Sequence, residues 1–570
     1  MDDPSADQLS SRGARGLQIE NVGRLLSLTA AANPNGVAVA EPHGRDANGR
    51  IRYRTLTFRE LDDDSDRIAR NLLAWGVQPG MRIVLMVPQS IDFISLVFAL
   101  FKSGVVTVLI DPGMGRRNIL RCLAEVDPAG FIAIPIVHGL RIFMSGRFPH
   151  AKWNVTVGRR WFWGGKTLKQ LRTAKTSGME LPTMRAEDQA AIIFTTGSTG
   201  PPKGVLYQHG NFAKQVEEIR DYYKIQPGEI DVAGFPLFAL FNAGMGVTTI
   251  IPQMDPTRPA RVNPRNIVDA VNQWQATQAF GSPALLNVVG KYCEGTGVTV
   301  PSLRRVLSAG APVPVHVLER MRKAIHPEGD IFTPYGATES LPVASISATE
   351  VLRETAQRTA LGAGTCVGRP FPGTAWKVIR ISDGPLPTIA DVQELPRGEI
   401  GEIMVRGKVV TREYITRTEA NALHKVTDGN TFWHRIGDVG YLDDVGRFWF
   451  CGRKSHRVRT LNGTMFTEQC EAIINSHPAI YRSALVGVGP PGEQMPVIIA
   501  EPWPEKWPRS KASREQLLQE LLDLAQCHEL TRSIPYFFLM RSLPVDIRHN
   551  AKIFREKLAV WAAKKLRRHL

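Results

Sequence analysis

The sequence predicts an α/β protein with two domains. We expect a large N-terminal domain (residues 1–453), in which helices cover mostly parallel sheets, and a small mobile α+β C-terminal domain (residues 454–570). Three observations support this prediction: strand candidates that are apolar along their whole length, a capped strand-helix-strand unit, and a change of pattern after residue 440. A chain of 570 residues is also too long for a single hydrophobic core.

The strand-helix-strand unit lies in the first quarter of the chain. Residues 82–87 form a β-rich apolar run, Ser90 can cap an apolar helix at 91–102, and Gly104 ends that helix before a strand at 105–110. Further wholly apolar strands are predicted at residues 131–136, 190–194 and 246–252. Such strands are typical of sheets with helices on both faces.

The C-terminal part has a different pattern. Asp443-Asp444-Val445-Gly446 is a turn signal inside a predicted hairpin at 441–450, and the polar stretch at 452–457 suits a linker. Beyond it we expect a helix at 468–475, strands at 483–489 and 497–502, and a helix at 514–528. From Lys552 onward, apolar residues recur at helical spacing opposite a basic face. This pattern favours a docked terminal helix, with membrane contact as the second interpretation.

Composition excludes several classes of protein. Hydrophobic residues make up 43% of the chain and charged residues 22%, which is typical of globular proteins. The N-terminus lacks the basic start and apolar run of a secretory signal, and no stretch offers the roughly 20 apolar residues of a membrane span. The six cysteines form no Cys-x-x-Cys pair, which argues against a zinc site or a disulfide framework. We therefore expect a cytoplasmic protein.

The formal net charge of +16 is compatible with nucleic acid, an anionic membrane or acidic ligands. No aromatic-basic recognition motif is present, so we expect no nucleic-acid partner. The cluster Arg159-Arg160-Trp161-Phe162-Trp163 has two interpretations. We favour a solvated rim beside packed aromatic residues, and an amphipathic loop that lies on lipid or on a partner protein stays open. Peripheral membrane association is thus an alternative to a purely cytoplasmic location.

A glycine-rich loop is the strongest functional signal. Residues 194–204 read Phe-Thr-Thr-Gly-Ser-Thr-Gly-Pro-Pro-Lys-Gly, directly after an apolar strand. Glycines let backbone N–H groups point inward, the hydroxyl groups add donors, and lysine adds positive charge, although the spacing is not that of a Walker loop. We predict that a phosphate group is bound by Thr195, Thr196, Gly197, Ser198, Thr199, Gly200 and Lys203. A flexible linker is the weaker alternative.

Together with this loop, four further segments also indicate ligand binding. Tyr335-Gly336-Ala337-Thr338-Glu339 offers an aromatic face, a hydroxyl group for phosphate and a carboxylate for a divalent cation. Asp438 can accept two hydrogen bonds from a ribose diol, Arg453 can bind phosphate or ribose oxygens, and Lys552 is a cation near the C-terminus. Taken singly, each also suits an ordinary cap, turn or solvated side chain.

In this order the segments resemble adenylate-forming enzymes of the acyl- and aryl-CoA synthetase, luciferase and peptide-synthetase class. The resemblance extends from Leu56-Thr57-Phe58-Arg59-Glu60-Leu61 through Lys552 and implies ATP and Mg²⁺ as cofactors. It implies that the loop grips pyrophosphate, that Tyr335 and the segment with Gly310, Ala311 and Pro312 flank adenine, and that Asp438 binds ribose. It further implies that Thr338 contacts phosphate, Glu339 helps to hold magnesium, and Lys552 bridges the carboxylate and the α-phosphate. Lys203, Thr338 and Lys552 are the predicted catalytic residues.

Three departures concern the second half-reaction of that class. Ala239, Ser455 and Ala551 stand where a His, an Asp or Lys, and a Gly are usual. Residues 254–259, 335–343, 364–368 and 545–552 are similar to the β-lactone synthetases of bacterial long-chain olefin biosynthesis. That resemblance implies a long-chain 2-alkyl-3-hydroxy acid as substrate, whose own hydroxyl attacks the acyl adenylate. It also leaves room for a complex with other enzymes of hydrocarbon biosynthesis.

Other functions stay open from sequence. One alternative is a fatty acid–CoA ligase or fatty acid–AMP ligase, and another is a non-catalytic nucleotide-binding scaffold of a lipid-processing complex. Candidate acyl-pocket residues lie at 235–241, 280–285 and 341–343, although core packing explains these apolar residues equally well.

Overall fold

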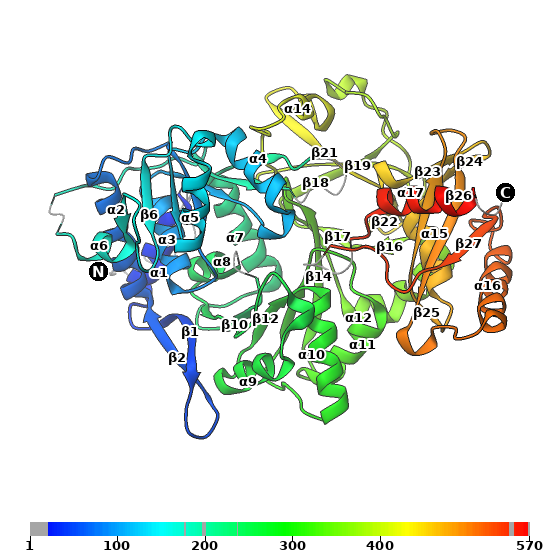
Figure 1. Cartoon of the computed structure of the whole chain (residues 1–570), viewed down its shortest axis with the longest axis horizontal. Coiled ribbons are helices and arrows are strands. Elements are labelled where there is room, and N and C mark those ends of the chain that lie inside the picture. The colour runs from blue at the N-terminus through cyan, green and yellow to red at the C-terminus, as the bar shows by residue number, and fades with distance from the viewer. Residues whose placement is uncertain (1–20, 176–177, 196–200, 236–237, 547–551, 568–570) are drawn as a thin grey trace, which may run out of the picture.

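The computed structural model describes residues 21–175, 178–195, 201–235, 238–546 and 552–567. Two large, mostly parallel sheets and one antiparallel sheet make up the N-terminal part, and smaller sheets make up the C-terminal part (Figure 1). The predicted α/β class with a large N-terminal and a small C-terminal part is confirmed.

The first sheet has seven strands in the order β7-β6-β5-β3-β4-β8-β9. These are β3 (Arg82–Met86), β4 (Val106–Leu109), β5 (Gly130–Ala133), β6 (Trp153–Thr156), β7 (Lys166–Thr167), β8 (Gln189–Phe194) and β9 (Gly204–Gln208). All neighbours are parallel except β8 and β9, which are antiparallel and flank the glycine-rich loop. The loop therefore lies at the carboxyl end of β8.

The second sheet has nine strands in the order β17-β15-β14-β13-β12-β10-β11-β1-β2. These are β1 (Val37–Arg45), β2 (Ile51–Thr57), β10 (Ile230–Ala233), β11 (Thr248–Ile250), β12 (Gln278–Gly281), β13 (Arg305–Ser308), β14 (Asp330–Ala337), β15 (Ser340–Ser347) and β17 (Arg369–Pro370). Neighbouring strands are parallel along the run β1-β11-β10-β12-β13-β14. The pairs at both edges are antiparallel.

The third sheet is antiparallel throughout, which the sequence did not predict. Its strands are β16 (Thr365–Cys366), β18 (Thr374–Ile379), β19 (Gly401–Gly407), β20 (Lys425–Asp428), β21 (Thr431–Leu442) and β22 (Phe448–Arg453). The hairpin of β21 and β22 contains the predicted Asp443–Gly446 turn. This sheet carries both Asp438 and Arg453.

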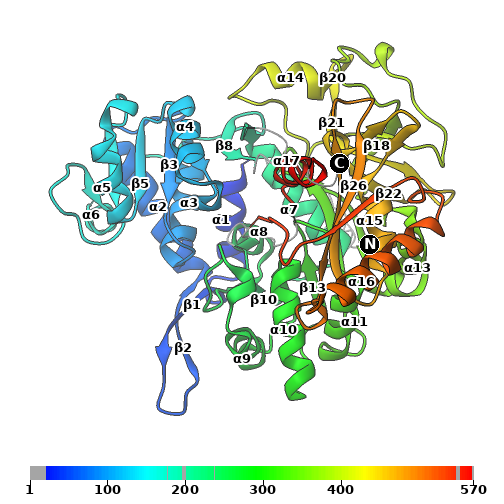
Figure 2. The same cartoon turned by 45° about the vertical axis from the view of Figure 1, so that its right-hand side comes forward.

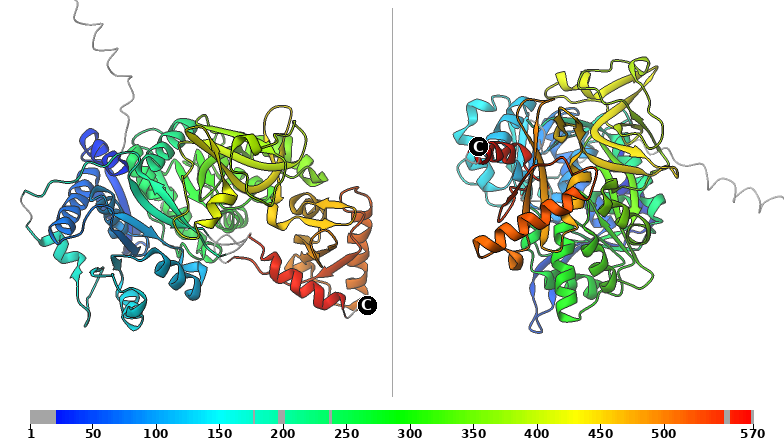
Figure 3. Two further views of the ribbon diagram at one scale, coloured as in Figure 1. Left: turned by 90° about the horizontal axis from the view of Figure 1, so that it is seen from above. Right: turned by 90° about the vertical axis from the view of Figure 1, so that its right-hand side faces the viewer.

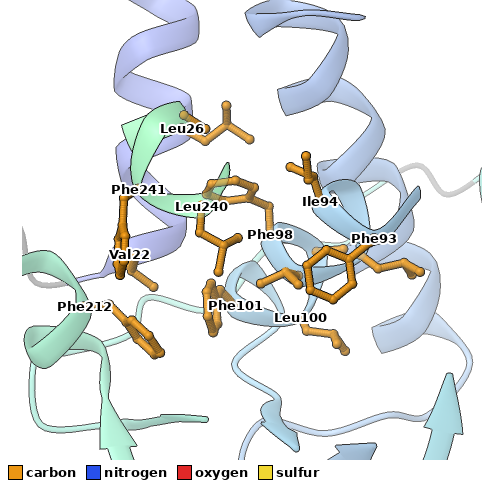
Figure 4. Close-up of a cluster of buried hydrophobic side chains, with 14 of the residues drawn as sticks. Val22, Leu26, Phe93, Ile94, Phe98, Leu100, Phe101, Phe212, Leu240 and Phe241 are labelled. Atoms are coloured by element: carbon orange, nitrogen blue, oxygen red, sulfur yellow. The ribbon is translucent and has the colours of Figure 1, made fainter. Parts of the chain in front are cut away.

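Helices between the two large sheets form the main hydrophobic core (Figure 4). The helices drawn there are α1 (Val22–Ala32), α3 (Ile91–Lys102), α7 (His209–Tyr223) and α8 (Phe238–Met245). Every residue of α3 except Asp92 is buried, because this helix is apolar nearly all round and lies between packed elements. Its predicted cap is present: the Phe93 N–H donates to Ser90 Oγ at 3.2 Å.

Other helices cover the outer faces of the two large sheets or lie at their edges. They are α2 (Phe58–Ala74), α4 (Arg116–Val126), α5 (Pro135–Phe143), α6 (Leu168–Thr173), α9 (Pro264–Trp274), α10 (Pro283–Thr296) and α11 (Val315–Ala324). The short helix α14 (Glu419–His424) lies instead against β20 and β21 of the third sheet. None of the helices in the described part of the chain combines the length and the apolar character that a bilayer-spanning segment needs.

The C-terminal elements gather at one end of the molecule (Figures 2 and 3). They are β23 (Val458–Thr460), β24 (Gly463–Met465), α15 (Thr467–Asn475), β25 (Ile480–Val488), β26 (Met495–Pro502), α16 (Lys511–Gln526), β27 (Tyr536–Leu539) and α17 (Arg555–Leu566). The helix α17 buries Leu558, Ala562 and Leu566 against β25 and β26, so it is a docked terminal helix. The boundary between residues 453 and 454 stays a prediction.

Several predicted bounds were wrong. The predicted strand at 131–136 ends at Ala133, because Pro135 starts the helix α5 and cannot donate to a strand ladder. The strand at 246–252 is confined to 248–250, since Gly246 has φ of +72° in the preceding turn. In the predicted linker at 452–457, the first two residues belong to β22.

Candidate functional site

The two ends of the glycine-rich loop are tied together. The Thr195 N–H donates to the Lys203 carbonyl at 3.0 Å, and the Lys203 N–H donates to Thr195 Oγ1 at 3.1 Å. These bonds extend the β8–β9 hairpin by one pair and fix where Lys203 leaves it. The predicted phosphate ligands Thr196, Gly197, Ser198, Thr199 and Gly200 lie outside the described residues.

Lys203 is held by two rings from the segment between β19 and β21. Its Nζ lies 3.2 Å from Nε2 of His424 and 4.4 Å from the ring centre of Tyr414. His424 ends α14, and its Nδ1 lies 2.9 Å from the carbonyl oxygen of Arg435. Burial lowers the pKa of the Lys203 amine, while the nearby Glu339 charge acts in the opposite direction.

The predicted metal ligand Glu339 lies beside the same tyrosine. The Tyr414 hydroxyl donates to Glu339 Oε1 at 2.6 Å, and Glu339 is 9% exposed. Its carbonyl oxygen accepts from both the N–H and the hydroxyl of Thr411 at 2.9 and 3.0 Å. Tyr414 therefore joins the predicted metal carboxylate to the predicted phosphate lysine.

Asp438 and Arg453 face each other across the β21–β22 pair. Asp438 Oδ1 lies 2.9 Å from Nη1 of Arg453, and the Tyr335 hydroxyl donates to Asp438 Oδ2 at 2.5 Å. Asp438 is 2% exposed, and burial raises the pKa of its carboxyl against the opposing effects of Arg453 and Tyr335. The Asp438 carboxylate in turn raises the pKa of Arg453. Three residues predicted from separate segments thus meet at one point.

The remaining nucleotide candidates lie on strands and loops of the second sheet. Tyr335 and Gly336 belong to β14, and Thr338 lies in the turn before β15, where its carbonyl accepts a hydrogen bond from the Tyr207 hydroxyl. Gly310, Ala311 and Pro312 form the loop between β13 and α11. Gly310 has φ of +99°, a backbone conformation that favours glycine, and it is exposed.

Lys552 lies in the segment that leads to α17. Its carbonyl accepts from the Asp546 N–H at 3.0 Å, and the flanking Val545 and Ile553 pair in an antiparallel bridge. In Figures 1 and 3 this red segment reaches back from the C-terminal elements toward the large N-terminal part.

Sequence reasoning missed Tyr414, His424, Lys425 and His434. Lys425 pairs with His434 across β20 and β21, and its amine donates to the Thr411 carbonyl. Burial lowers the pKa of Lys425 to about 7 and that of His424 to about 4, and it holds the pKa of His434 well below its usual value. No local motif marks these residues, because strand pairing and the Lys203 contact bring them together.

The donor set fits a magnesium nucleotide. Asp438 Oδ1 has no hydrogen-bond donor with good geometry among the described residues, although Arg453 is near, so it can accept from a hydroxyl group. Among those residues no three His, Cys, Asp or Glu side chains converge on a metal position. A single carboxylate such as Glu339 suits Mg²⁺, which is commonly held by one or two carboxylates together with phosphate oxygens.

Comparison with known proteins defines the class. Residues 27–415 match the AMP-binding enzyme family, and the chain belongs to this family of enzymes. The chain is 45% identical over 550 residues to the olefin beta-lactone synthetase of Xanthomonas campestris pv. campestris, with 95% of this chain and 97% of that protein covered. It is 43% identical over 554 residues to the olefin beta-lactone synthetase of Stenotrophomonas maltophilia, with 96% and 98% covered.

A solved structure supports the fold. The O-succinylbenzoate coenzyme A synthetase of Bacillus subtilis, in complex with ATP and magnesium ion, superposes with a TM-score of 0.72 at 23% identity, with 94% of this chain and 98% of that chain covered. At this identity the likeness concerns the fold alone.

Proposed function

We propose that this enzyme uses ATP to activate a long-chain 2-alkyl-3-hydroxy acid and closes it to a β-lactone, with release of AMP and pyrophosphate. The observation that carries the proposal is the 45% identity, over nearly the full length of both chains, to a protein named olefin beta-lactone synthetase. The enzyme works beside those that make its acid and consume its lactone, in a complex of hydrocarbon biosynthesis.

The nucleotide lies between the loop and the third sheet. Lys203 and the loop from Thr195 hold the pyrophosphate end, and Asp438 with Arg453 holds the ribose. Tyr335, Gly336 and the exposed loop at 310–312 flank the adenine. Support comes from the ion pair and hydrogen bond that already fix Asp438 between Arg453 and Tyr335. Glu339 would hold Mg²⁺, and the bound ion would supply positive charge to the phosphate oxygens.

Adenylation joins two anions, so cations are needed. A carboxylate oxygen of the acid attacks the α-phosphorus of ATP, and the bond from that phosphorus to the bridging oxygen breaks to release pyrophosphate. Lys203 neutralises the leaving group. Lys552 bridges the carboxylate and the α-phosphate when the C-terminal part closes, and Thr338 donates to a phosphate oxygen.

Lactone formation needs no second substrate. The 3-hydroxyl oxygen attacks the acyl carbon, the bond from that carbon to the AMP oxygen breaks, and the hydroxyl proton leaves with AMP as base or with solvent. Because hydroxyl and carbonyl belong to one molecule, their effective concentration is high without an acceptor channel. This agrees with the departures at Ser455, which is exposed, and at Ala239 and Ala551.

A small apolar cavity of about 30 Å³ lies beside part of the predicted acyl pocket. It lies between the second sheet and its outer helices, and it includes Phe280, Gly281 and Leu285 of the predicted pocket range together with Gly234. The ring of Phe235 lies 6.0 Å from that of Phe280, centre to centre. A cavity of this size holds only a short part of an alkyl chain, and we assign it to part of one of the two chains of the acid.

Product analysis tests the proposed function. The enzyme is incubated with ATP, Mg²⁺ and a long-chain 2-alkyl-3-hydroxy acid, with and without CoA, and products are measured by mass spectrometry. We expect lactone, AMP and pyrophosphate in equal amounts in both reactions. Acyl-CoA as the product, or turnover that requires CoA, would establish the acyl-CoA ligase alternative. AMP binding without any turnover would establish the scaffold alternative.

A further inference from the structure

One face of the first sheet's outer layer exposes large apolar side chains. Ile136, Leu140 and Phe143 of α5 are 65%, 53% and 85% exposed. Their spacing places them on one side of the helix, whereas His138 on the other side is buried and its Nε2 donates to the Val155 carbonyl oxygen at 2.9 Å. The helix α5 is therefore docked by its inner side and leaves an apolar outer side in solvent.

The loop after β6 adds two aromatic residues to this face. Trp161 and Phe162 are 59% and 76% exposed, and their rings each lie 5.4 Å from that of the buried Trp163. Trp163 is anchored by its Nε1 donating to Thr156 Oγ1 at 2.9 Å, and its ring lies 5.8 Å from that of His138 in α5. We call the exposed residues of α5 and of this loop the aromatic surface.

The chain around the aromatic surface is strongly basic. Residues 128–179 contain nine Lys or Arg residues and no Asp or Glu, so this stretch carries +9 of the net +16. Arg147, Arg159 and Arg160 are exposed, and Arg160 donates to the Gly165 carbonyl. Arg172 is an exception, because it pairs with Asp64 and Asp92 at 2.7 Å each. Because cations surround exposed apolar rings, this surface is suited to a partner with an anionic exterior and an apolar interior.

We propose that the aromatic surface docks the enzyme on a lipid bilayer that carries anionic headgroups. Tryptophan and phenylalanine enter the boundary between headgroups and acyl chains, while Arg159, Arg160 and Arg147 bind lipid phosphates. The inference rests on the proposed function in one respect: an acid with two long alkyl chains is itself held in membranes. Docking gives the enzyme direct access to that acid.

The position of α5 agrees with docking. In Figure 2, α5 and α6 lie at the edge of the large N-terminal part that faces away from the C-terminal elements. An enzyme bound through this edge keeps its C-terminal part clear of the bilayer. Closure of that part over the nucleotide is then compatible with membrane binding.

Vesicle co-sedimentation tests the proposal with the full-length protein. Vesicles of phosphatidylcholine alone are compared with vesicles that also contain phosphatidylglycerol, at low and high salt. We expect binding to the anionic vesicles that weakens at high salt. The variant F143S/W161S/F162S should bind at least about tenfold more weakly, and R159Q/R160Q should lose about fivefold per arginine.

A matched control is Leu461→Ser, because Leu461 is 82% exposed but lies in the distant β23–β24 turn. It should bind vesicles as the wild type does. The proposal is overturned if wild type fails to bind anionic vesicles, or if both multiple variants bind as tightly as wild type. Salt-sensitive binding to acidic proteins but not to vesicles would identify a protein partner instead. Lactone formation from detergent-dispersed acid is measured in parallel. A failure of the proposed function is thereby distinguished from a failure of vesicle binding.

Discussion

The amine of Lys203 lies 3.2 Å from Nε2 of His424, whose other ring nitrogen lies 2.9 Å from the Arg435 carbonyl oxygen. A carbonyl oxygen can only accept, so Nδ1 carries the hydrogen and Nε2 presents its lone pair to the lysine. The pKa of His424, lowered by burial to about 4, keeps this ring neutral at neutral pH. His424 therefore positions the Lys203 ammonium.

Replacement of His424 should affect the enzyme through Lys203. In His424→Gln the amide oxygen can still accept a hydrogen bond from the Lys203 amine. In His424→Asn the shorter amide can donate to the Arg435 carbonyl oxygen but does not reach the lysine. We expect His424→Asn to slow ATP–pyrophosphate exchange by about 10-fold to 100-fold, as for the loss of a hydrogen bond to a charged group, and His424→Gln to retain most activity. In a Lys203→Met background the two variants should be indistinguishable. Equal losses in both single variants would contradict the positioning role.

The pairing of Asp438 with Arg453 and Tyr335 predicts a ribose site. Because Asp438 would accept hydrogen bonds from the ribose diol, 2′-deoxy-ATP should bind wild type about tenfold more weakly than ATP does. Asp438→Asn should weaken ATP binding and abolish this preference, as measured by titration calorimetry. If Asp438→Asn still prefers ATP by the wild-type ratio, Asp438 does not bind the ribose.

A buried ion network should contribute to stability. Glu402 is fully buried, and its oxygens lie 2.6 Å from Arg435 and 2.8 Å from Lys454. Glu402→Ala leaves two cations without their carboxylate and should lower the free energy of unfolding by about 3–5 kcal/mol, measured by urea denaturation. Glu515→Ala breaks the exposed ion pair between Lys511 and Glu515, and it should change the free energy of unfolding by less than about 1 kcal/mol. Similar losses of unfolding free energy in the two variants would contradict a stabilising role of the buried Glu402 network.

Buried His209 should make stability depend on pH. Neither ring nitrogen has a hydrogen-bond partner in the described part of the chain, and burial lowers the pKa of His209 to about 4 from 6.5. Between these values the unfolded chain binds a proton that the folded chain does not, so stability falls as pH drops from 6.5 to 4. Relative to His209→Leu, wild type should lose up to about 3 kcal/mol between pH 7 and 4. Parallel pH curves would show that the pKa of His209 is the same in the folded and the unfolded chain, and would contradict the prediction.

The sequence predicted those parts of the structure that local patterns determine. The helix at 91–102 and its Ser90 cap were correct, because composition and capping are local. The strand at 131–136 was wrong at its end, since apolar residues continue from β5 into α5 and only Pro135 marks the change. The family resemblance assigned Tyr335 and Asp438 to one nucleotide site, but the hydrogen bond between them was not predicted. The contact of Lys203 with His424 could not be predicted, because it joins residues far apart in sequence.

The central claim is that the substrate's own 3-hydroxyl captures its carboxyl adenylate. Oxygen tracing tests this most directly, with one sample of acid labelled by ¹⁸O in the carboxylate and another labelled in the 3-hydroxyl. We predict that one carboxylate ¹⁸O appears in AMP and the other in the lactone carbonyl, while the hydroxyl ¹⁸O stays in the lactone ring. Hydroxyl ¹⁸O found in AMP would show that the hydroxyl, not the carboxylate, is activated, and would contradict the account.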